Sequence, residues 1–520
     1  VQDFFHFILT TMCCVHRYKF PLLVHASAVM LAYGVALRAG DTRQSSGSTQ
    51  FPHLRQALPV PSSHSRDESR AETIRDALRF FWNGYRKSAW GADQVKPVTG
   101  KVGDRWGNVG MTIIDSLDTL YLAGLEQEFS QGLEFVASLS VEPPANGYRT
   151  SFFELVIRGL GGLLACHAVS GSPVCLDKAK EFGEHLLLGF NRSEGGTTLP
   201  WPAAYIDIRN PRDAETAAGW MGNKVALADV GSNLLEFVYL SQATGDARFE
   251  EAAVANENRL LQLAADQGKH LQQVFLRANA RKSDGGGVSV GAYGDSYYEY
   301  LLKGYIQSNG ANRELLQEFK AAMDEMRQEL LREAGHHTYI GSLTGNHVME
   351  HLTCFMGGLL ALGAHVAPKE DREDWWLPTA IDVTETCYQM YHQSPSGLAP
   401  DIARIGEKIT SAQGDFRVRP ETLESLFILY RITGNATYRD MSWEIFQAID
   451  KHTRTTYGFS SLVDVTVNPP QKKNSEETFV GAETLKYALL IHLPVSVLPL
   501  DRFVLNTEAH PMPIEDRHVL

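Results

Sequence analysis

Three segments of the chain place acidic side chains beside arginine or aromatic residues, at spacings that put them on one helix face. These side chains are Glu154 and Arg158, Asp295 and Glu299, and Glu421 and Glu424. Such pairs also occur as buried ion pairs, and acids in a first helical turn also complement the helix dipole. Several clusters of this kind in one helical chain favour glycoside chemistry, which needs one carboxylic acid to protonate the leaving oxygen and one carboxylate to act as base or nucleophile.

Two other motifs match catalytic patterns but lack the context that the chemistry needs. Residues 287–291, GVSVG, match the nucleophile elbow of serine hydrolases, yet the preceding RKSDGG cannot form the buried strand it requires, so we expect a flexible loop. Residues 347–351, HVMEH, match a zinc-peptidase motif whose spacing sets two imidazoles on one helical face. The preceding LTGN predicts a turn and no downstream helix offers an isolated glutamate ligand, so a zinc peptidase is the least favoured hypothesis.

Helices must position the acidic clusters, because residues 73–513 show apolar residues at spacings of three and four in successive segments. Glycine-centred corners near 171, 245 and 309 predict αα-hairpins. The acid-bearing loops lie at the opposite helix ends, at 283–299, 394–424 and 472–483. Stacked hairpins form an open solenoid or a closed toroid. Loops gathered at one end favour a toroid with one functional mouth, and an open helical-repeat binding protein is the alternative.

The composition is that of a folded soluble protein. The 520 residues are 44% apolar and 21% charged, which excludes a wholly disordered chain and a polytopic membrane protein. A net charge of −13, without a long basic run in the body, argues against a nucleic-acid partner. The six cysteines contain no C-x-x-C pair, and the four outside the apolar N-terminal stretch leave room for one or two disulfides. Those four are Cys166, Cys175, Cys354 and Cys387.

The N-terminal part predicts entry into the secretory pathway. Residues 20–37 form an uncharged apolar run between basic residues, which fits a type II signal anchor or a cleaved signal peptide within 1–39, with a buried helix as a third reading. Residues 40–72 are rich in Ser, Pro, Gly, Gln, Arg and Asp, and we expect a flexible, disordered stem. The first two readings place the body in the secretory lumen, and the glycosylation sequons at Asn191 and Asn435 agree with that.

Seven motifs follow one another through the body. They are Trp106-Gly107 with DSLDTL at 115–120, FELVIRGLGGLL, GDSYYEYLLK, HLTCF, RPETLESL, FVGAETLKY and LNTEAHP at 505–511. In content and order they resemble the class I α-1,2-mannosidases, glycoside hydrolase family 47. The resemblance implies an all-α (α/α)7 barrel over 73–513 followed by a tail at 514–520, an inverting mechanism and one Ca²⁺ at the barrel floor.

By motif match, the resemblance also implies roles for individual residues. Glu154 and Asp295 are the two candidates for the acid side, with Glu154 acting through a water, and Glu421 is the base that activates the attacking water. Thr507 would bind Ca²⁺ through its carbonyl and hydroxyl oxygens. The residues that match the family's sugar pocket are Arg158, His351, Arg419, Pro420, Glu424, Phe479, Glu483 and Glu508, with Glu299 and Asp118 ranked lower, and Asp229 stands at a position that contacts the oligosaccharide in the family.

The resemblance extends to two of the cysteines and fails at three other positions. Cys354 and Cys387 match the family's disulfide, whereas Cys166 and Cys175 are expected to be free. Three positions depart from the family pattern, and they are Asp229 and Asp401, where glutamate is common, and Tyr293, where the endoplasmic-reticulum type carries arginine and the Golgi type a smaller apolar residue. Lacking that arginine, the chain is expected to remove more than a single mannose.

The expected function is therefore a Ca²⁺-dependent exo-α-1,2-mannosidase that trims high-mannose N-glycans on glycoproteins in the endoplasmic reticulum or Golgi, or outside the cell if the N-terminal segment is cleaved. We expect a monomer that contacts the membrane only through its N-terminal segment. The alternative is a mannose-recognising quality-control factor with weak or no hydrolase activity. Such factors tend to vary the NTEAHP ending, which this chain keeps.

Overall fold

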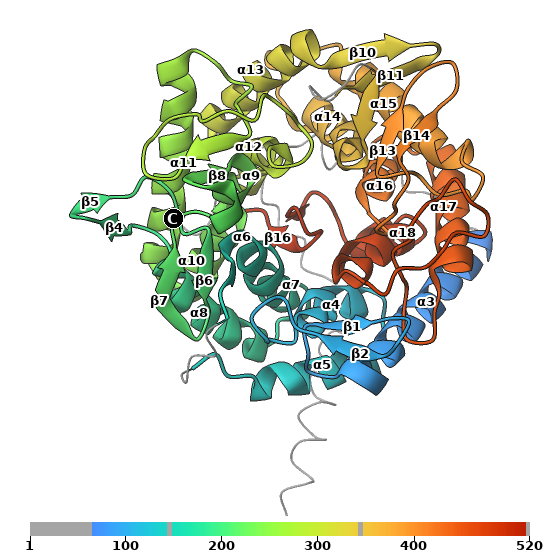
Figure 1. Ribbon diagram of the computed structural model, residues 1–520, viewed down its shortest axis with the longest axis horizontal. Helices are drawn as coiled ribbons and strands as arrows, with labels where there is room; N and C mark the ends of the chain where they lie inside the picture. The colour runs from blue at the N-terminus through green and yellow to red at the C-terminus, as the bar shows by residue number, and fades with distance from the viewer. Residues whose placement is uncertain (1–64, 143–147, 342–346, 516–520) are drawn as a thin grey trace, which may run out of the picture. The chain divides into compact units, whose positions relative to one another are not determined.

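The computed structural model describes residues 65–142, 148–341 and 347–515. The expected signal or anchor segment, most of the expected stem and most of the expected tail lie outside the described residues. Figure 1 shows the described body as a closed ring of helices, with β16 (Pro511–Pro513) inside the ring.

The ring has an inner and an outer layer of helices that alternate along the chain. The inner layer consists of α4 (Met111–Leu122), η1 with α7 (Leu155–Leu160 and Gly161–Ser170), α10 (Leu234–Thr244), α12 (Asp295–Gln307), α14 (Phe355–Val366), α16 (Glu421–Thr433) and η4 with α18 (Val480–Thr484 and Leu485–Leu490). Each inner helix contacts the next, and η4 contacts α4, which closes the ring. The outer layer consists of α3 (Ser65–Ala89), α5 (Glu126–Ser138), α8 (Pro173–Leu187), α11 (Ala247–Gln267), α13 (Arg313–Glu329), α15 (Trp376–His392) and α17 (Thr437–Thr453). The two layers confirm the predicted (α/α)7 barrel.

Short elements connect the helices. They include the helices α6 (Phe152–Glu154), η2 (Gly219–Met221), α9 (Leu227–Gly231), η3 (His351–Cys354) and η5 (Val495–Val497). The strands form small antiparallel sheets: β1 (Gln94–Lys96) with β2 (Lys101–Gly103), β4 (Ser193–Glu194) with β5 (Thr197–Thr198), β8 (Lys224–Ala226) with β9 (Phe275–Arg277), β10 (Leu331–Ala334) with β11 (His337–Ile340), and β15 (Phe503–Leu505) with β16. Two sheets have three strands, β3 (Thr150–Ser151), β6 (Tyr205–Asp207) and β7 (Asn210–Glu215), and β12 (Val348–Glu350), β13 (Ile402–Arg404) and β14 (Thr410–Gln413).

The predicted glycine corners are present at the end of the ring away from the acidic loops. Gly171 and Gly245 end α7 and α10 in the left-handed conformation, with φ of 70° and 71°. The side chain of Asp246 then caps α11 by accepting the N–H of Arg248, and Asn312 caps α13 in the same way. Because each inner helix leaves the cavity end and each outer helix returns to it, the loops between hairpins all face one side.

The described stem residues differ from the prediction. Residues 65–72 form the first two turns of α3 and are not a solvated linker. Asp67 is buried against Arg439 of α17 at 2.6 Å and His492 at 3.3 Å. A polar composition therefore misled the prediction, because the partners that bury Asp67 lie far along the chain.

The two decoy motifs do not form the structures that their chemistry needs. Residues 287–291 lie in a loop, as predicted. In this loop the Ser289 hydroxyl accepts the Gly291 N–H at 2.9 Å. In 347–351 the helix that the zinc motif requires is absent, because residues 348–350 form β12 and His351 begins η3. The two imidazoles therefore share no helical face, and the zinc-peptidase hypothesis is wrong in its geometry.

One described segment, Phe152–Ser170, is long and apolar enough to cross a membrane. Of its apolar window, 72% is buried in the ring. It is accordingly part of the barrel's inner layer.

Candidate active site

A cavity of about 610 Å³ lies at the end of the ring that carries the acid-bearing loops. It brings together most of the residues that the sequence assigned to the site. The assigned residues in its lining are Glu154, Arg158, Asp229, Asp295, Glu299, Arg419, Pro420, Glu421, Glu424, Phe479, Glu483, Thr507 and Glu508. Two others lie outside the lining, where His351 contacts Glu421 and Asp118 contacts His510.

A change of helix type positions Glu154 and Arg158. Glu154 ends α6, and the π-helix η1 carries Arg158 on the following turn. The Nε atom of Arg158 donates to Oε2 of Glu154 at 2.6 Å. The glycines that follow allow α7 to pack closely on α4, because a Cβ at Gly162 would lie 2.7 Å from the carbonyl oxygen of Ile114.

Arg158 is the buried cation at one wall of the cavity. Its guanidinium group donates to Glu154 and to Glu508. The rings of Trp106 and Phe479 flank it, with centroids 5.5 and 5.7 Å from its Cζ. An arginine stays charged when buried, so this contact offsets two carboxylates and fixes their side chains at the wall.

The loop at 506–510, here called the floor loop, joins β15 to β16 and places Thr507 and Glu508 in the cavity lining. The side chain of Asn506 fixes its shape, because Oδ1 accepts the backbone N–H groups of Glu508 at 2.9 Å and His510 at 2.8 Å. The floor loop is thus rigidly held at the inner end of the site.

A buried charged network anchors the floor loop to α4. Nε2 of His510 lies 3.0 Å from Oδ1 of Asp115, and Nδ1 lies 3.1 Å from Oδ1 of Asp118. Lys486 lies 2.6 Å from the other oxygen of Asp118. Burial would raise the pKa of Asp118, but Lys486 and His510 bring that pKa below its ordinary range. Asp118 therefore supports the floor loop and does not line the cavity.

Lys303 is a second buried cation, on α12. It donates to Glu299 one turn earlier and lies 3.7 Å from Oε1 of Glu424. Burial raises the pKa of Glu424 to about 8, although Lys303 acts in the opposite direction. Sequence reasoning missed Lys303, and the signal that could have found it is a lysine on the same helix face as an acidic pair.

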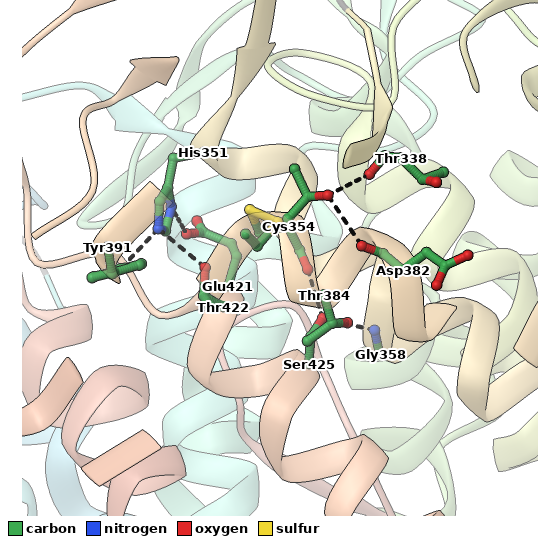
Figure 2. The surroundings of a disulfide bond; sticks show 12 residues. Thr338, His351, Cys354, Gly358, Asp382, Thr384, Tyr391, Glu421, Thr422 and Ser425 are labelled. Atoms are coloured by element: carbon green, nitrogen blue, oxygen red, sulfur yellow. Dashed lines mark hydrogen bonds and ion pairs between the residues drawn. A yellow bond between two sulfur atoms is a disulfide. The ribbon is translucent and has the colours of Figure 1, made fainter. Parts of the chain in front are cut away.

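The side chain of His351 contacts the carboxylate of Glu421, as Figure 2 shows. Pro420 precedes the first turn of α16, so Glu421 is its first residue. Nδ1 of His351 lies 2.9 Å from Oε2 of Glu421, and Nε2 lies 2.8 Å from the hydroxyl of Tyr391 and 3.3 Å from that of Thr422. The imidazole therefore bridges α16 and α15 and fixes the orientation of the Glu421 carboxylate.

Two disulfides brace the ring. Cys354 and Cys387 are bonded as expected, and Figure 2 places this bond beside the His351 contacts. Cys166 and Cys175, expected to be free, are bonded to each other. They lie in α7 and in the first turn of α8, on either side of the Gly171 corner, so the hairpin brings their Cα atoms within 6.0 Å. Two cysteines flanking a predicted corner were a signal for this pair.

The lining carries more carboxylates than guanidinium groups. Burial raises the pKa of Asp295 to about 7, with Glu299 and Glu421 adding to the shift. Burial and the charge of Glu154 raise the pKa of Asp229 to about 7. Carboxyl groups with such pKa values hold a proton part of the time at neutral pH, which a general acid requires.

Metal binding at the cavity would depend on oxygen atoms. Among the described residues, no three His, Cys, Asp or Glu side chains are grouped as metal ligands. The lining offers Thr507 and a set of carboxylates, which are donors suited to a hard cation such as Ca²⁺.

Asp93 fixes the loop that carries Trp106, and no sequence argument pointed to it. Its fully buried carboxylate accepts the backbone N–H groups of Arg105, Trp106, Asn108, Val109, Gly110 and Met111, at 2.6–3.3 Å. Every residue type except proline supplies a backbone N–H, so the residue types of these partners gave no signal.

All three positions that depart from the family pattern lie at the site, since Asp229 and Tyr293 line the cavity and Asp401 contacts Arg419 of the lining. Oδ1 of Asp401 accepts Nε of Arg419 at 2.6 Å, and its carbonyl oxygen accepts the His351 N–H at 2.9 Å. The shorter acid therefore still reaches the arginine in the lining.

Comparison with known proteins agrees with this geometry. The sequence model of the family described as glycosyl hydrolase family 47 matches residues 77–514 of this chain. A mannosyl-oligosaccharide 1,2-alpha-mannosidase of Arabidopsis thaliana is 36% identical over 463 residues, covering 87% of this chain and 80% of the relative. The endoplasmic reticulum mannosyl-oligosaccharide 1,2-alpha-mannosidase of Mus musculus is 36% identical over 464 residues, covering 86% of this chain and 68% of the relative.

A solved structure shares the fold. The alpha-1,2-mannosidase from Trichoderma reesei superposes with a TM-score of 0.77 at 25% identity, covering 86% of this chain and 99% of that chain. The family match spans most of the described barrel, including every residue of the cavity lining. The chain therefore belongs to glycosyl hydrolase family 47 and is a glycosidase.

Proposed function

We propose that this glycosidase is an exo-acting, inverting α-1,2-mannosidase that trims terminal mannose from high-mannose N-glycans. The relatives named above are mannosyl-oligosaccharide 1,2-alpha-mannosidases. The observation that carries the proposal is that Glu154, Asp295 and Glu421 line one cavity whose inner end is formed by the floor loop. β16, which follows the floor loop, lies inside the ring (Figure 1), so a glycan would enter the cavity by its terminus and would not pass through the ring.

In this proposal Glu421 is the general base. Its carboxylate takes a proton from the water that attacks the anomeric carbon, and His351 keeps it aimed at that water. Inversion follows if the water enters from the face opposite the leaving oxygen, with about 6.5–9.5 Å between base and acid.

Glu154 and Asp295 form the acid side. Burial raises the pKa of Asp295 to about 7, so a proton is available there at neutral pH. Glu154 is held by Arg158 at the same cavity and can pass a proton to the leaving oxygen through a water. The pair thus supplies and delivers the proton that the leaving sugar needs.

One Ca²⁺ would complete the proposed site, and the carbonyl and hydroxyl oxygens of Thr507 would hold it. Burial raises the pKa of Glu424 to about 8 and the pKa values of Glu483 and Glu508 well above their ordinary range. A divalent cation would favour the charged form of these carboxyl groups, so the acid-rich lining fits such a cation. When bound, Ca²⁺ polarises the hydroxyls and the water that it ligates. The protein's own groups place the sugar and move the protons.

We place the enzyme in the lumen of the secretory pathway, as a monomer whose membrane contact is limited to its N-terminal segment. The support is the name of the mouse relative, an endoplasmic reticulum enzyme, together with two disulfides, which persist in oxidising compartments.

One assay tests the function and its alternatives. The purified chain is incubated with Man9GlcNAc2 after EDTA treatment, with Ca²⁺ or Zn²⁺ restored, and released mannose is measured by mass spectrometry. Release that returns with Ca²⁺ alone supports the proposal. Glycan binding without release supports a mannose-recognising factor, and release that returns with Zn²⁺ alone contradicts the assigned metal.

Calcium binding needs a readout other than activity. Ca²⁺ should raise the thermal midpoint of the wild-type chain, and the rise should be smaller for Thr507→Ala, which lacks the hydroxyl ligand. Thr484→Ala is the matched control, because its buried hydroxyl donates to the Val418 carbonyl at 2.6 Å outside the lining. Equal rises for all three proteins would contradict the assignment of Thr507.

A further inference from the structure

Two large aromatic side chains in the cavity lining are open to solvent. Trp220 is 65% exposed and Tyr293 is 42% exposed, and both line the cavity that contains Glu154 and Asp295. Exposed aromatic groups of this size at a cavity indicate a binding surface, because they leave apolar area in water that a ligand would cover.

The two rings belong to a packed row. The ring centroids of Trp220 and Tyr293 lie 6.0 Å apart at an angle of 47°, and those of Tyr293 and Phe275 lie 5.3 Å apart at 44°. Phe275 is half-buried at the start of β9. The row thus begins in the body of the protein and ends on the exposed indole, so the outer rings are supported from one side.

The backbone at Tyr293 is held in an unusual conformation. Its φ is 69°, in the left-handed region, which is rare for a bulky residue and costs free energy. Its carbonyl oxygen accepts the N–H of Ala228 at 2.9 Å, which keeps the residue in this conformation. Glycine or asparagine would adopt the same backbone with less strain, so the strain is consistent with a requirement for the ring.

The row lies close to the reacting groups. Tyr293 is two residues before Asp295, so the two Cα atoms are at most about 7.6 Å apart. If the terminal mannose occupies the acid-lined part of the cavity, the sugar on the other side of the scissile bond leaves past these rings. A pyranose ring has an apolar C–H face that suits an aromatic surface, with hydroxyl groups around its edge.

We infer that Trp220 and Tyr293 form a stacking platform for a sugar ring in the leaving part of the glycan. This inference rests on the proposed function, because it takes the bond cleaved to be glycosidic with the terminal mannose at the acids. The platform binds the rest of the glycan and takes no part in proton transfer. Its loss should weaken binding of long glycans most.

Two substrates separate this inference from the function itself. Man9GlcNAc2 carries sugars beyond the scissile bond, whereas α-mannosyl fluoride carries none. Trp220→Ala should lower kcat/KM for Man9GlcNAc2 at least tenfold, mainly through KM, and should lower kcat/KM for the fluoride much less. Trp220→Phe, which keeps an aromatic face, should recover part of the loss on the glycan.

Trp90→Ala is the matched control, since Trp90 is 40% exposed and lies outside the cavity lining. It should leave the ratio of the two kcat/KM values at the wild-type level, and thermal midpoints check that each variant is folded. An unchanged ratio in Trp220→Ala would overturn the platform. If the wild-type chain cleaves neither substrate, the proposed function is overturned instead.

Discussion

Nδ1 of His351 lies 2.9 Å from Oε2 of Glu421, and the other ring nitrogen lies 2.8 Å from the Tyr391 hydroxyl. Because each nitrogen has its own partner, the orientation of the imidazole, and with it that of the carboxylate, depends on Tyr391. Tyr391→Phe should lower kcat about 10–100-fold with little change in KM. Tyr388→Phe is the control on the same helix, because its hydroxyl donates to Glu444 at 2.6 Å outside the lining. Steady-state kinetics on Man9GlcNAc2 would contradict this role if both variants lost the same activity.

A substrate whose leaving group needs no proton can show which of Glu154 and Asp295 is the proton donor. Glu154→Gln and Asp295→Asn should each lower kcat on Man9GlcNAc2 by about 100-fold or more. On α-mannosyl fluoride, the variant that has lost the proton donor should regain most of its rate, and the other should stay slow. Recovery of neither variant would show that the acid lies elsewhere.

Glu257 predicts a dependence of stability on pH. This carboxyl group of α11 lies outside the cavity lining, and among the described residues its Oε1 has no hydrogen-bond partner. Burial, with the charge of Glu318, raises its pKa to about 8 from an ordinary value of 4.5. The folded state therefore binds more protons between these pH values, and the free energy of unfolding falls as pH rises from about 5 to 8.

Glu257→Gln should remove this penalty. We expect the free energy of unfolding at pH 8 to rise by roughly 1–3 kcal/mol relative to wild type, and the difference to shrink toward zero at pH 5. Urea unfolding at the two pH values measures both. Glu251→Gln, at an exposed position of the same helix, should show no such pH-dependent difference. A Glu257→Gln effect of equal size at both pH values would point to packing and not to the proton.

The two disulfides should differ in their effect on activity. Cys354–Cys387 joins η3 to α15, the elements that carry His351 and Tyr391, whereas Cys166–Cys175 braces an outer corner. Replacing either pair with serine should destabilise the chain by about 2–4 kcal/mol. Only loss of Cys354–Cys387 should also lower kcat when the rate is measured at a temperature below the thermal midpoint of the variant. Equal kcat values for the two double variants would contradict the link between this disulfide and His351.

The helical ring and the positions of the acidic clusters could be predicted because their signals are local. Apolar spacing, the glycine at 171 and the cap at Asp246 each act within a few residues. The motif at 419–425 likewise placed Glu421 in the first turn of α16, as observed. The resemblance then named the residues that would meet, which periodicity alone could not do.

Features that depend on distant partners were missed. Residues 348–350 became a strand because β12 pairs with β13, where Met349 opposes Ala403. The start of α3 depends on the contact of Asp67 with Arg439. Neither pairing leaves a trace in the local pattern, because two or more α-helices lie between the partners in the sequence.

The most direct test of the central claim is the configuration of the mannose that is first released. Proton NMR during hydrolysis of Man9GlcNAc2 by the Ca²⁺-loaded wild-type chain should show β-mannose appearing before mutarotation, and Glu421→Gln should bind the glycan and release none. Initial release of α-mannose, or normal release by Glu421→Gln, would contradict an inverting site in which Glu421 is the base.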